Sequence, residues 1–568
     1  MMMETYLSKP WLTSYDTGVP ATVDVPGDSI PQAFKKIVEQ YPDKLAIVFY
    51  GKQLTYRELL QQVDMLASSL SAMGIGKGDV VALYVLNSPQ YIITYLAVLT
   101  AGAAVTPVSP VFTSHELKYQ LQDSGARAIL CQDILYDNLD KTGLKLDKVI
   151  VTGVEEYLPT VRKLLGKSML KKFALEMNLP TPSIPKEKNI CWFQDLLKPA
   201  KVTALPAQID AQCDLASISY SGGTTGPPKG VMLSHAQLLS TAAMIHAYYP
   251  NSVKGQEVYP AYLPLYHAYG QMAVMVGGLL HAATLIIFTT PAIDDILDAV
   301  ERYQATVFFG VPTMYEFLKE YDKTSRVNWR RFRLILCGAD TLQERTITDW
   351  ERRTGSHIIE GYGQTEGGGV SLGHPQNKPK MGSIGIPLPN ITAAIADPDD
   401  PHRLLPVGEV GEIIVRGPNV MLGYWNKPEA SAEVLVEING ERWLRTGDLG
   451  KMDEEGYFYF VDRKRDLIKF KGYSVFARDV EDVLYLHPQV KAAGVIGVPD
   501  PRVGQLIKAN IVLQPEARGK VSEEEIIQFC TERLSFYKVP KIVEFRGELP
   551  KTDVGKVSRR ELREEEEA

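Results

Sequence analysis

Apolar and polar residues alternate along the first third of the chain in a pattern that predicts helices and strands in turn. The segment 30–41 carries its apolar side chains on one face of a predicted helix. Thr55 and Glu58 have the spacing of a capping box that begins the next helix. Short β-prone apolar runs lie between the predicted helices at 46–50, 79–85, 103–108 and 126–131. Strands separated by helices of this length need crossover connections, so we predict an α/β fold with a largely parallel sheet.

The pattern changes near residue 462 and predicts a domain boundary there. Short apolar strands and glycine-marked turns alternate from 381 to 462, and a dense run of charges, Asp462 to Asp466, ends that block. Beyond it, a hairpin pattern, further apolar strands and a helix begun by Ser522 make up a block of about a hundred residues, a common domain size. We therefore predict a small α+β domain after the charge run.

Composition narrows the classes of protein that fit this pattern. The 568 residues exceed the length of one domain, and 45% hydrophobic with 23% charged content is typical of a globular protein. The net charge of −7 disfavours a general nucleic-acid binder, so we expect no nucleic-acid partner. Five scattered cysteines without a CxxC pair or a Cys/His cluster indicate neither a disulfide framework nor a zinc site. They favour a reducing, cytoplasmic location.

Three stretches bear on contact with a membrane. The N-terminus lacks the basic and apolar segments of a signal peptide. The longest apolar run, Met272 to Phe288, contains His281 and two glycines, and we interpret it as a buried junction of strand and helix. Residues 160–178 predict a basic amphipathic helix. Such a helix fits peripheral contact with the inner face of a membrane, and it also fits a helix packed on the protein's own surface with solvated lysines.

A polar loop between two β-prone runs is the most informative stretch. The residues Ser221 to Lys229, SGGTTGPPK, follow the apolar segment 215–220 and precede the run 230–233. Glycine lets backbone N–H groups approach phosphate oxygens, while threonine hydroxyls and a lysine add donors and charge. The stretch is not the common nucleotide P-loop, because Pro228 rather than glycine precedes the lysine. We interpret it as a polyphosphate-binding loop; a plain surface loop is the alternative.

A second polar stretch, Glu360 to Glu366 (EGYGQTE), follows a predicted strand. The Tyr362 ring can stack on a base, Thr365 can contact a phosphate, and Glu366 can hold Mg²⁺. A polar β-turn is the alternative interpretation. Asp448 lies at a predicted turn, where its carboxylate can accept hydrogen bonds from two ribose hydroxyls. Taken alone, His267 has the pattern of a satisfied core histidine and Lys556 that of a surface lysine.

Together these stretches resemble the adenylate-forming superfamily, which contains acyl-CoA synthetases, firefly-type luciferases and the adenylation domains of peptide synthetases. Within the superfamily the chain is most similar to acyl-CoA synthetases that act on fatty or aryl acids. The resemblance runs from near residue 30 to near residue 560 and rests on segments that follow one another in the family's order: Ser221–Lys229, Gly361–Glu366, Thr446-Gly447-Asp448, Asp462-Arg463, Lys469–Tyr473 and Gly555-Lys556.

The resemblance implies an α/β fold with a large N-terminal AMP-binding region and a small, mobile α+β C-terminal lid domain. The lid is expected to turn about a hinge at Arg465 between two half-reactions. The implied substrates are ATP, a carboxylic acid and coenzyme A, with Mg²⁺ as cofactor; a homodimer is a further hypothesis. The implied limits are 1–462 for the large region, with α/β halves at about 30–212 and 213–380 and a β subdomain at 381–462, and 463–568 for the lid.

The resemblance also assigns residues to the two half-reactions. The predicted catalytic residues are Lys556, Thr365, Glu366 and His267, where Lys556 bridges the acyl carboxylate and the phosphate and His267 borders the acyl pocket. The predicted phosphate site comprises Ser221, Gly222, Gly223, Thr224, Thr225, Gly226 and Lys229, with Mg²⁺ held by Thr224 and Glu366. The rest of the nucleotide site comprises Gly338, Ala339, Asp340, Glu360, Gly361, Tyr362, Gly363, Asp448 and Arg463. For thioester formation, the Lys556 face would give way to the face that bears Lys469, Gly472 and Tyr473.

The leading hypothesis is an AMP-forming ligase that joins a medium- or long-chain fatty acid to coenzyme A. An aryl-acid CoA ligase of the 4-coumarate type is the alternative within the same chemistry. A peptide-synthetase adenylation subunit is disfavoured because no carrier domain follows. A non-catalytic acyl- or nucleotide-binding protein is disfavoured because both Glu366 and Lys556 are kept. The triple glycine 367–369 is expected to leave space in the wall of the acyl pocket.

Overall fold

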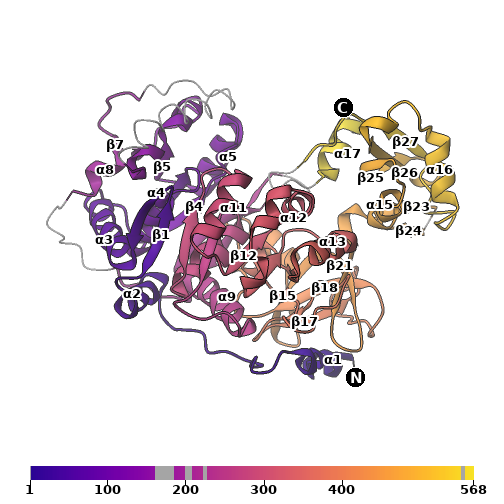
Figure 1. The fold of residues 1–568 in the computed structure, drawn as a ribbon, viewed down its shortest axis with the longest axis horizontal. Coiled ribbons are helices and arrows are strands. Elements are labelled where there is room, and N and C mark those ends of the chain that lie inside the picture. The colour runs from indigo at the N-terminus through magenta and orange to yellow at the C-terminus, as the bar shows by residue number, and fades with distance from the viewer. Residues whose placement is uncertain are drawn as a thin grey trace.

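The computed structural model describes residues 2–159, 184–198, 207–221, 227–471, 473–551 and 557–567. Within them a large region and a smaller C-terminal domain lie beside each other (Figure 1). Their apolar cores are separate, since one cluster gathers buried side chains from Tyr6 to Phe458 and another gathers them from Ile468 to Val543. The mixed α/β architecture confirms the predicted fold class. The exact domain limits stay a prediction.

An eight-stranded sheet with the strand order β19-β9-β8-β4-β3-β5-β6-β7 lies in the large region. The strands from β8 to β7 run parallel to one another, which confirms the predicted largely parallel sheet, and β9 pairs antiparallel with β8. Its strands are β3 Val80–Tyr84, β4 Ala104–Pro107, β5 Ala128–Gln132, β6 Lys148–Thr152, β7 Ile190–Trp192, β8 Leu215–Ser221, β9 Lys229–Ser234 and β19 Gly423–Tyr424.

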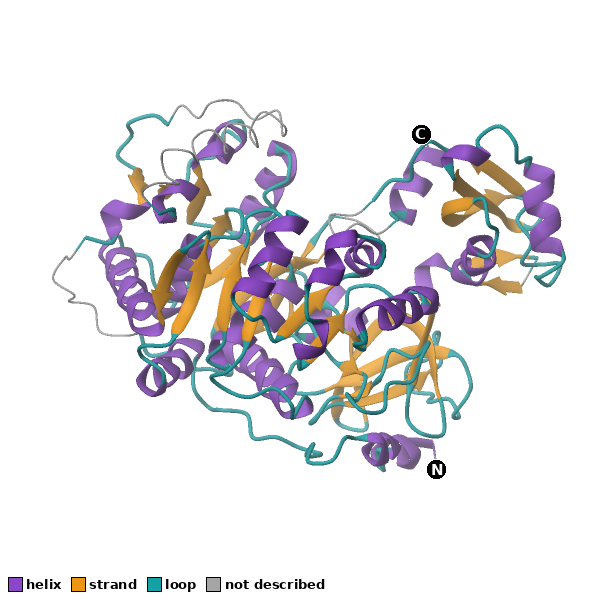
Figure 2. Ribbon diagram, in the orientation of Figure 1, coloured by secondary structure: helices purple, strands orange, loops and turns teal. Residues whose placement is uncertain are grey.

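Both faces of this sheet are covered, as a parallel sheet requires. Val81 and Leu83 of β3 belong to the main apolar cluster, whereas Val80, Ala82 and Tyr84 belong to a second cluster on the other face. The helices that provide this cover and the first part of the core are α2 Ile30–Gln40, α3 Tyr56–Ala72, α4 Pro89–Thr100, α5 Ser114–Ser124, α6 Tyr136–Asp140, α8 Phe193–Leu196 and α9 His235–Tyr248 (Figure 2).

Three smaller sheets complete the large region. The order β10-β11-β1-β2 joins β1 Leu45–Phe49, β2 Lys52–Thr55, β10 Val258–Ala261 and β11 Thr284–Ile287. The order β12-β13-β14-β15-β16 joins β12 Val307–Gly310, β13 Leu334–Cys337, β14 Ile359–Tyr362, β15 Leu372–Gly373 and β16 Ile386–Pro387, and α11 Ile293–Arg302, α12 Pro312–Leu318 and α13 Glu344–Thr354 lie between these strands in the sequence. The last sheet contains β17 Thr392–Ala396, β18 Gly411–Arg416, β20 Leu435–Ile438, β21 Glu441–Met452 and β22 Phe458–Arg463, with α14 Pro428–Val434 beside it in the sequence.

Local sequence signals produce the helix starts that were predicted from them. The Thr55 side chain accepts a hydrogen bond from the Glu58 backbone N–H, and the Glu58 carboxylate accepts one from the Thr55 N–H, which completes the capping box. In α2 the residues on the predicted apolar face, among them Phe34 and Ile37, are buried. These helices pack their apolar faces against the core and expose their polar faces.

The long apolar run Met272 to Phe288 forms a helix followed by a strand. It begins within a π-helix, η4 Gly270–Val276, continues as α10 Gly277–Leu280, and ends in the buried strand β11. The predicted buried junction of helix and strand is therefore confirmed. Among the described residues, no helix has the length and apolar character needed to cross a membrane. The basic segment 160–178 lies outside the described residues.

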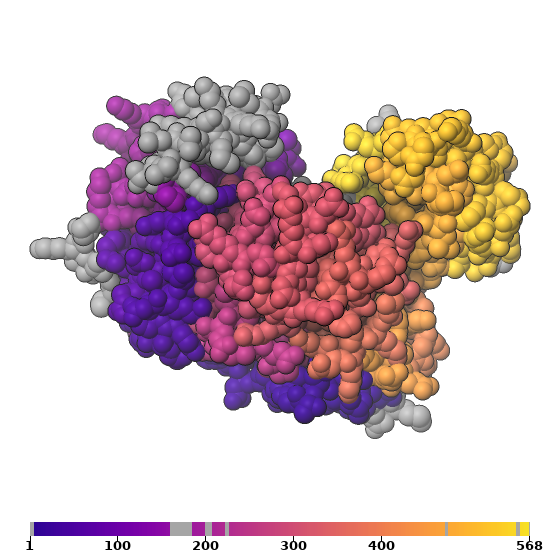
Figure 3. Space-filling view, in the orientation of Figure 1, coloured from indigo at the N-terminus to yellow at the C-terminus, as the bar shows by residue number. Residues whose placement is uncertain are grey.

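The C-terminal domain is a sheet covered by three helices. Its strands are β23 Ile468–Phe470, β24 Tyr473–Val475, β25 Val490–Asp500, β26 Gly504–Leu513 and β27 Ile542–Phe545, and its helices are α15 Ala477–Tyr485, α16 Glu523–Thr531 and α17 Arg559–Glu567. Ser522 caps α16 by accepting a hydrogen bond from the Glu525 N–H, as predicted. In the space-filling view a notch separates this domain from the large region on the face shown (Figure 3).

The N-terminal segment packs on the small β subdomain, which the sequence did not predict. Tyr6 donates a 2.8 Å hydrogen bond to the Leu405 carbonyl oxygen and Tyr15 a 2.7 Å bond to that of Pro387. Trp11 is fully buried and approaches Gly456 so closely that a Cβ there would lie 2.6 Å from its backbone. Aromatic side chains therefore connect segments of the chain that lie up to about 400 residues apart in the sequence.

Replacing Trp11 with alanine should destabilise the large region. Large-to-small changes at buried tryptophans typically cost about 3–5 kcal/mol, because a cavity remains where the ring was packed. Urea unfolding of the Trp11→Ala chain measures this loss, and Leu7→Ala, at an exposed position of the same segment, serves as the control. Equal stability of the two variants would show that the N-terminal segment contributes nothing to the core.

Candidate active site

The β8–β9 hairpin frames the predicted phosphate loop. Its register pairs Ser221 with Lys229, so the two ends of the loop lie opposite each other. The Tyr119 hydroxyl donates a 2.9 Å hydrogen bond to the Pro228 carbonyl oxygen and ties the loop's second half to α5. The predicted strand before the loop is confirmed. Gly222, Gly223, Thr224, Thr225 and Gly226 lie outside the described residues.

Tyr424 joins the phosphate hairpin to the second polar stretch. The Lys229 ammonium lies 5.0 Å from the centroid of the Tyr424 ring, and the Tyr424 hydroxyl donates a 2.9 Å hydrogen bond to Glu366 Oε1. Burial and the neighbouring Glu366 carboxylate raise the pKa of Tyr424, so the hydroxyl keeps its proton. The ring reaches this place because β19 pairs with β9. Two motifs more than a hundred residues apart thus share one tyrosine, which the sequence analysis did not identify.

A cavity of about 380 Å³ is lined in part by two of these side chains, Glu366 and Tyr424. Its walls contain both acidic and basic groups, including Glu366 and Arg445. Arg445 is held by Glu412, to which its Nη2 donates a 2.5 Å hydrogen bond. A volume of this size suits a small ligand rather than a few waters. The complete lining is Gln364, Glu366, Glu412, Tyr424, Glu433, Val434, Arg445, Thr446 and Gly447.

Asp448, Tyr362 and Arg463 come together as a polar group. The Tyr362 hydroxyl donates a 2.6 Å hydrogen bond to Asp448 Oδ2, and Arg463 Nε lies 3.5 Å from Asp448 Oδ1. Burial and the adjacent carboxylate hold the pKa of Tyr362 well above 10, so it stays a donor. Asp448 lies within β21 (Glu441–Met452) and pairs with Arg463, so the predicted turn is a bulge inside a strand. At this bulge Gly447 has a φ of 72°, the register with β18 shifts, and the Asp448 N–H donates a 3.1 Å hydrogen bond to the Thr446 hydroxyl. The local bend and the pairing with β22 together position this carboxylate.

Glu360 is a buried carboxyl within β14. Its Oε1 accepts a 2.9 Å hydrogen bond from the Leu342 N–H, while its Oε2 has no hydrogen-bond partner in the described part of the chain. Loss of solvation raises its pKa to about 7, an effect that the charge of Arg478 partly opposes. A carboxyl with such a pKa changes its charge near neutral pH.

The predicted nucleotide-site glycines lie in crowded surroundings. A Cβ on Gly338 would lie 3.1 Å from the Tyr269 ring, and one on Gly363 would lie 2.3 Å from the Gly369 carbonyl oxygen. Ala339, between Gly338 and Asp340, has a positive φ of 73°. The turn after β13 therefore follows a path that few side chains permit, as expected for backbone that must approach a ligand. Gly361, by contrast, has room for a Cβ, with its nearest neighbour at 3.8 Å.

The triple glycine 367–369 does not open the wall of a pocket. A Cβ on Gly368 would lie 2.7 Å from the Thr241 hydroxyl, and one on Gly369 would lie 3.3 Å from the Met272 side chain. The expectation of free space at these glycines is therefore wrong. They allow η7 (Thr365–Gly367) and the turn after it to pack directly on α9 and the π-helix η4.

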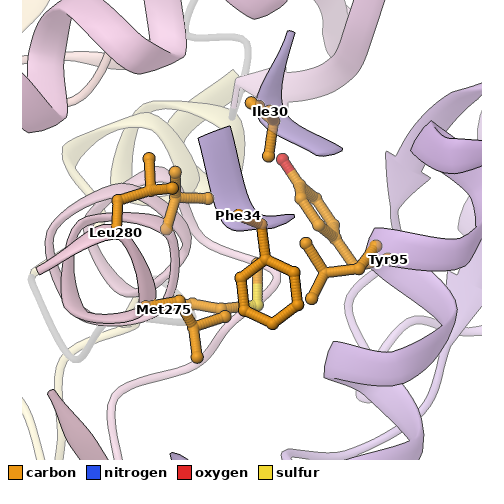
Figure 4. Close-up of a pocket in the computed structure, with 8 residues that line it drawn as sticks. Ile30, Phe34, Tyr95, Met275 and Leu280 are labelled. Atoms are coloured by element: carbon orange, nitrogen blue, oxygen red, sulfur yellow. The ribbon is translucent and has the colours of Figure 1, made fainter. Parts of the chain in front are cut away.

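His267 and the π-helix η4 lie close in sequence to the residues that contact Gly369, namely Ala268 and Met272. The Tyr269 N–H approaches His267 Nδ1 at 3.3 Å, and the half-buried ring stands just before η4. π-Helical turns are rare and frequent at functional sites. Farther along the same helix, Met275 helps to line an apolar cavity of about 10 Å³ together with Ile30, Phe34, Tyr95 and Leu280 (Figure 4). This cavity has room for about one water molecule and is too small for an alkyl chain without side-chain movement.

Of the predicted residues of the C-terminal domain, the structure describes Lys469 and the backbone of Tyr473, and neither is brought to this site. Lys469 lies exposed on the β23–β24 hairpin, on the side of the domain away from the large region (Figure 1). The backbone of Tyr473 pairs with Phe470 in that hairpin. Gly472 and Lys556 lie outside the described residues. Among the described residues, the site consists mainly of side chains from the large region, and Arg478 of α15 reaches its edge by donating a 2.9 Å hydrogen bond to the Thr341 hydroxyl.

The raised pKa of Glu360 predicts a pH-dependent loss of stability. Between pH 4.5 and 7 the folded state binds more of this proton than the unfolded state, so the free energy of unfolding falls as the pH rises through that range. Glu360→Gln removes the effect and should be more stable than wild type at pH 8 by about 1–3 kcal/mol, with little difference at pH 4.5. Urea unfolding at both pH values measures it. Glu320→Gln, at an exposed carboxylate, is the control, and a pH-independent difference for Glu360→Gln would contradict the assignment.

Comparison with known proteins agrees with this geometry. The family described as AMP-binding enzyme matches residues 34–425, and the family described as AMP-binding enzyme C-terminal domain matches residues 479–556. A long-chain-fatty-acid–CoA ligase of Bacillus subtilis (strain 168) is 38% identical over 98% of both chains. A feruloyl-CoA synthase of Amycolatopsis is 33% identical over 92% of this chain and 96% of its own.

Solved structures give the same result for the fold. The crystal structure of ATP-bound MatB from Rhodopseudomonas palustris is 28% identical, covers 95% of this chain and 99% of its own, and superposes with a TM-score of 0.80. The family models match most of the chain, the relatives align over nearly its full length, and the solved structure has the same fold. The chain belongs to the AMP-binding enzyme family and is an adenylate-forming acyl-CoA ligase.

Proposed function

We propose that this ligase activates long-chain fatty acids. Its full-length similarity to a long-chain-fatty-acid–CoA ligase supports this choice of acid. The observation that carries the chemistry is the contact of Lys229 and Glu366 with one tyrosine, because it places a cation and a candidate metal-binding carboxylate at the mouth of the phosphate hairpin.

The reaction has two steps that balance in charge and atoms. In the first, an oxygen of the fatty carboxylate attacks the α-phosphorus of ATP, the bond to the β-phosphate oxygen breaks, and acyl-AMP and pyrophosphate form. In the second, the coenzyme A sulfur attacks the acyl carbon, its proton is lost, and AMP leaves. Both partners of the first step are anions, so cations and in-line positioning provide most of the catalysis.

The proposed roles of individual residues follow the resemblance to the adenylate-forming superfamily, and contacts among the described residues support some of them. Lys229, with the loop residues Ser221 and 222–226, would bind the β- and γ-phosphates, and Thr365 the α-phosphate. Asp448 would accept hydrogen bonds from the ribose hydroxyls. Tyr362 and Arg463, which contact Asp448, would orient its carboxylate. The base would lie beside Tyr362, within the backbone of Gly338–Asp340, Glu360, Gly361 and Gly363. His267 would border the acyl group, and Lys556 would join the carboxylate to the phosphate.

Mg²⁺ is part of the proposal, and the residues present fit it. Glu366 offers carboxylate oxygens at the edge of the 380 Å³ cavity, and the Tyr424 hydroxyl occupies one position on Oε1. Among the described residues no group of three or more His, Cys, Asp or Glu side chains could hold a metal alone. Mg²⁺ usually binds through one or two carboxylates together with substrate phosphates, which suits a single glutamate. Thr224 is the second proposed protein ligand. When bound, Mg²⁺ would neutralise phosphate charge.

A panel of acids tests the proposed substrate. Acid-dependent ATP–pyrophosphate exchange should be fastest with hexadecanoic acid and at least about 10-fold slower with octanoic and ferulic acids, since each buried methylene contributes about 0.8 kcal/mol. Addition of coenzyme A should release AMP and acyl-CoA. Lys556→Ala should abolish exchange. Faster exchange with ferulic acid would favour an aryl-acid ligase, and exchange retained in Lys556→Ala would refute the role of that lysine.

Removing the hydroxyl of Tyr424 should weaken the use of ATP. Hydrogen bonds to charged groups contribute about 1.5–3 kcal/mol, so Tyr424→Phe should lower kcat/KM for ATP by roughly 10-fold or more, and Tyr424→Ala further, because the ring beside Lys229 is also lost. Steady-state kinetics with hexadecanoic acid measure both. Tyr303→Phe, at a half-buried tyrosine outside the site, is the control. An unchanged kcat/KM in Tyr424→Phe would show that the tyrosine does not organise the site.

A further inference from the structure

A half-buried arginine joins the two sides of the predicted hinge. Arg559, the first residue of α17 in the C-terminal domain, donates a 2.9 Å hydrogen bond from Nη1 to Asp462 Oδ1 on β22 of the large region. The same guanidinium donates a 2.9 Å bond from Nε to Glu481 Oε1 and a 2.5 Å bond from Nη2 to Glu481 Oε2 on α15. Its Nη1 also lies 3.1 Å from Asp466 Oδ2, just past the hinge. One side chain therefore connects the large region, the hinge and two helices of the C-terminal domain.

Asp462 accepts hydrogen bonds from the C-terminal domain through both of its carboxylate oxygens. The carboxylate is completely buried, and its second oxygen, Oδ2, accepts a 3.0 Å hydrogen bond from the Arg478 backbone N–H at the start of α15. The Arg478 guanidinium continues the contact by donating a 2.9 Å bond to the Thr341 hydroxyl, beside the turn at Gly338–Asp340. Both oxygens of one buried aspartate thus bind groups that would move with the domain.

These contacts fix one orientation of the domain. In that orientation α17 faces the large region, while the β23–β24 hairpin with Lys469 faces away from it (Figure 1). The hairpin can approach the site only if the domain turns, and a turn about residues 463–466 must separate Asp462 from Arg559 or Arg478. A buried charged pair is costly to break and leave unpaired, so these bonds resist the turn.

We propose that Arg559 is a positioning residue which, through Asp462, holds the C-terminal domain in the orientation for adenylate formation and must let go before thioester formation. This inference rests on the two-step function proposed above. We call the contacts of Arg559 with Asp462 and Glu481 and of Arg478 with Asp462 the hinge latch. Its cross-hinge part is Asp462; its part within the C-terminal domain is Glu481.

Asp462→Asn tests the cross-hinge part alone. The amide oxygen can still accept the Arg478 N–H, but the NH₂ group opposes the Arg559 guanidinium, which keeps Glu481 and Asp466. We expect ATP–pyrophosphate exchange with hexadecanoic acid to fall by about 10-fold or more, the usual effect of losing a hydrogen bond between charged groups. Transfer from preformed hexadecanoyl-adenylate to coenzyme A should stay within about 2-fold of wild type, since that step does not use the latch.

Matched variants separate positioning from folding. Glu481→Gln weakens the contact inside the domain and should lower its thermal stability without changing the ratio of the two half-reactions. Arg560→Ala removes a charge from the next position of α17, where the side chain pairs with Glu564, and should leave both rates within about 2-fold. Arg559→Met in the Asp462→Asn background should change that ratio no further. Equal losses in both half-reactions of Asp462→Asn, or no loss in either, would overturn the proposal.

Distance measurements test the latch independently of activity. Spin labels at Asp322→Cys in the large region and Glu523→Cys on α16 occupy exposed positions, in a background where Cys213 and Cys191 are replaced by serine. Wild type should give one narrow distance distribution and Asp462→Asn a broader one; identical distributions would overturn the latch. If hexadecanoic acid supports no exchange in wild type, the proposed function fails, while these distances still decide whether the latch exists.

Discussion

Repulsion between two anions is the constraint on which this site depends. A fatty carboxylate and a polyphosphate approach each other only where positive charge is held in place and kept available. If Lys229 and Glu366 bonded directly, each would neutralise the other. Tyr424 contacts them separately, the lysine through its ring face and the glutamate through its hydroxyl. The ammonium therefore stays free to meet phosphate, and the carboxylate keeps oxygens for a metal.

The fold supplies this arrangement through strand pairing between distant segments. β8 and β9 hold the two ends of the phosphate loop opposite each other, and the short strand β19 adds Tyr424 to the edge of β9. A second pairing, β21 with β22, sets Arg463 against Asp448. In both cases main-chain hydrogen bonds fix the register, and register alone decides which side chains face each other.

Local features of this structure could be predicted and long-range ones could not. The capping box of Thr55 and Glu58 involves residues three apart, so the sequence contains all of its information. Tyr424 had no such signal, because its partners lie in β9 and in η7. The turn expected at Asp448 is a bulge inside β21, where Gly447 has a φ of 72° and the register with β18 shifts; the sequence indicates this local bend but not the pairing of Asp448 with Arg463 on β22. The prediction of open space at the triple glycine 367–369 was wrong because glycine permits open space and close packing alike. The neighbours Thr241 and Met272, which are distant in sequence, decide between the two. The roles assigned to individual residues come from the resemblance and stay predictions.

One strand links the site to the C-terminal domain. Arg463 and Asp462 are neighbours on β22, and successive residues of a strand point to opposite faces. The arginine accordingly lies against Asp448 in the proposed nucleotide site, while the aspartate faces Arg559 and Arg478 of the C-terminal domain. A shift of β22 that followed the exchange of ATP for AMP would move both side chains together. Coupling between chemistry and domain orientation then needs no long path through the protein, since two adjacent residues on one strand provide it.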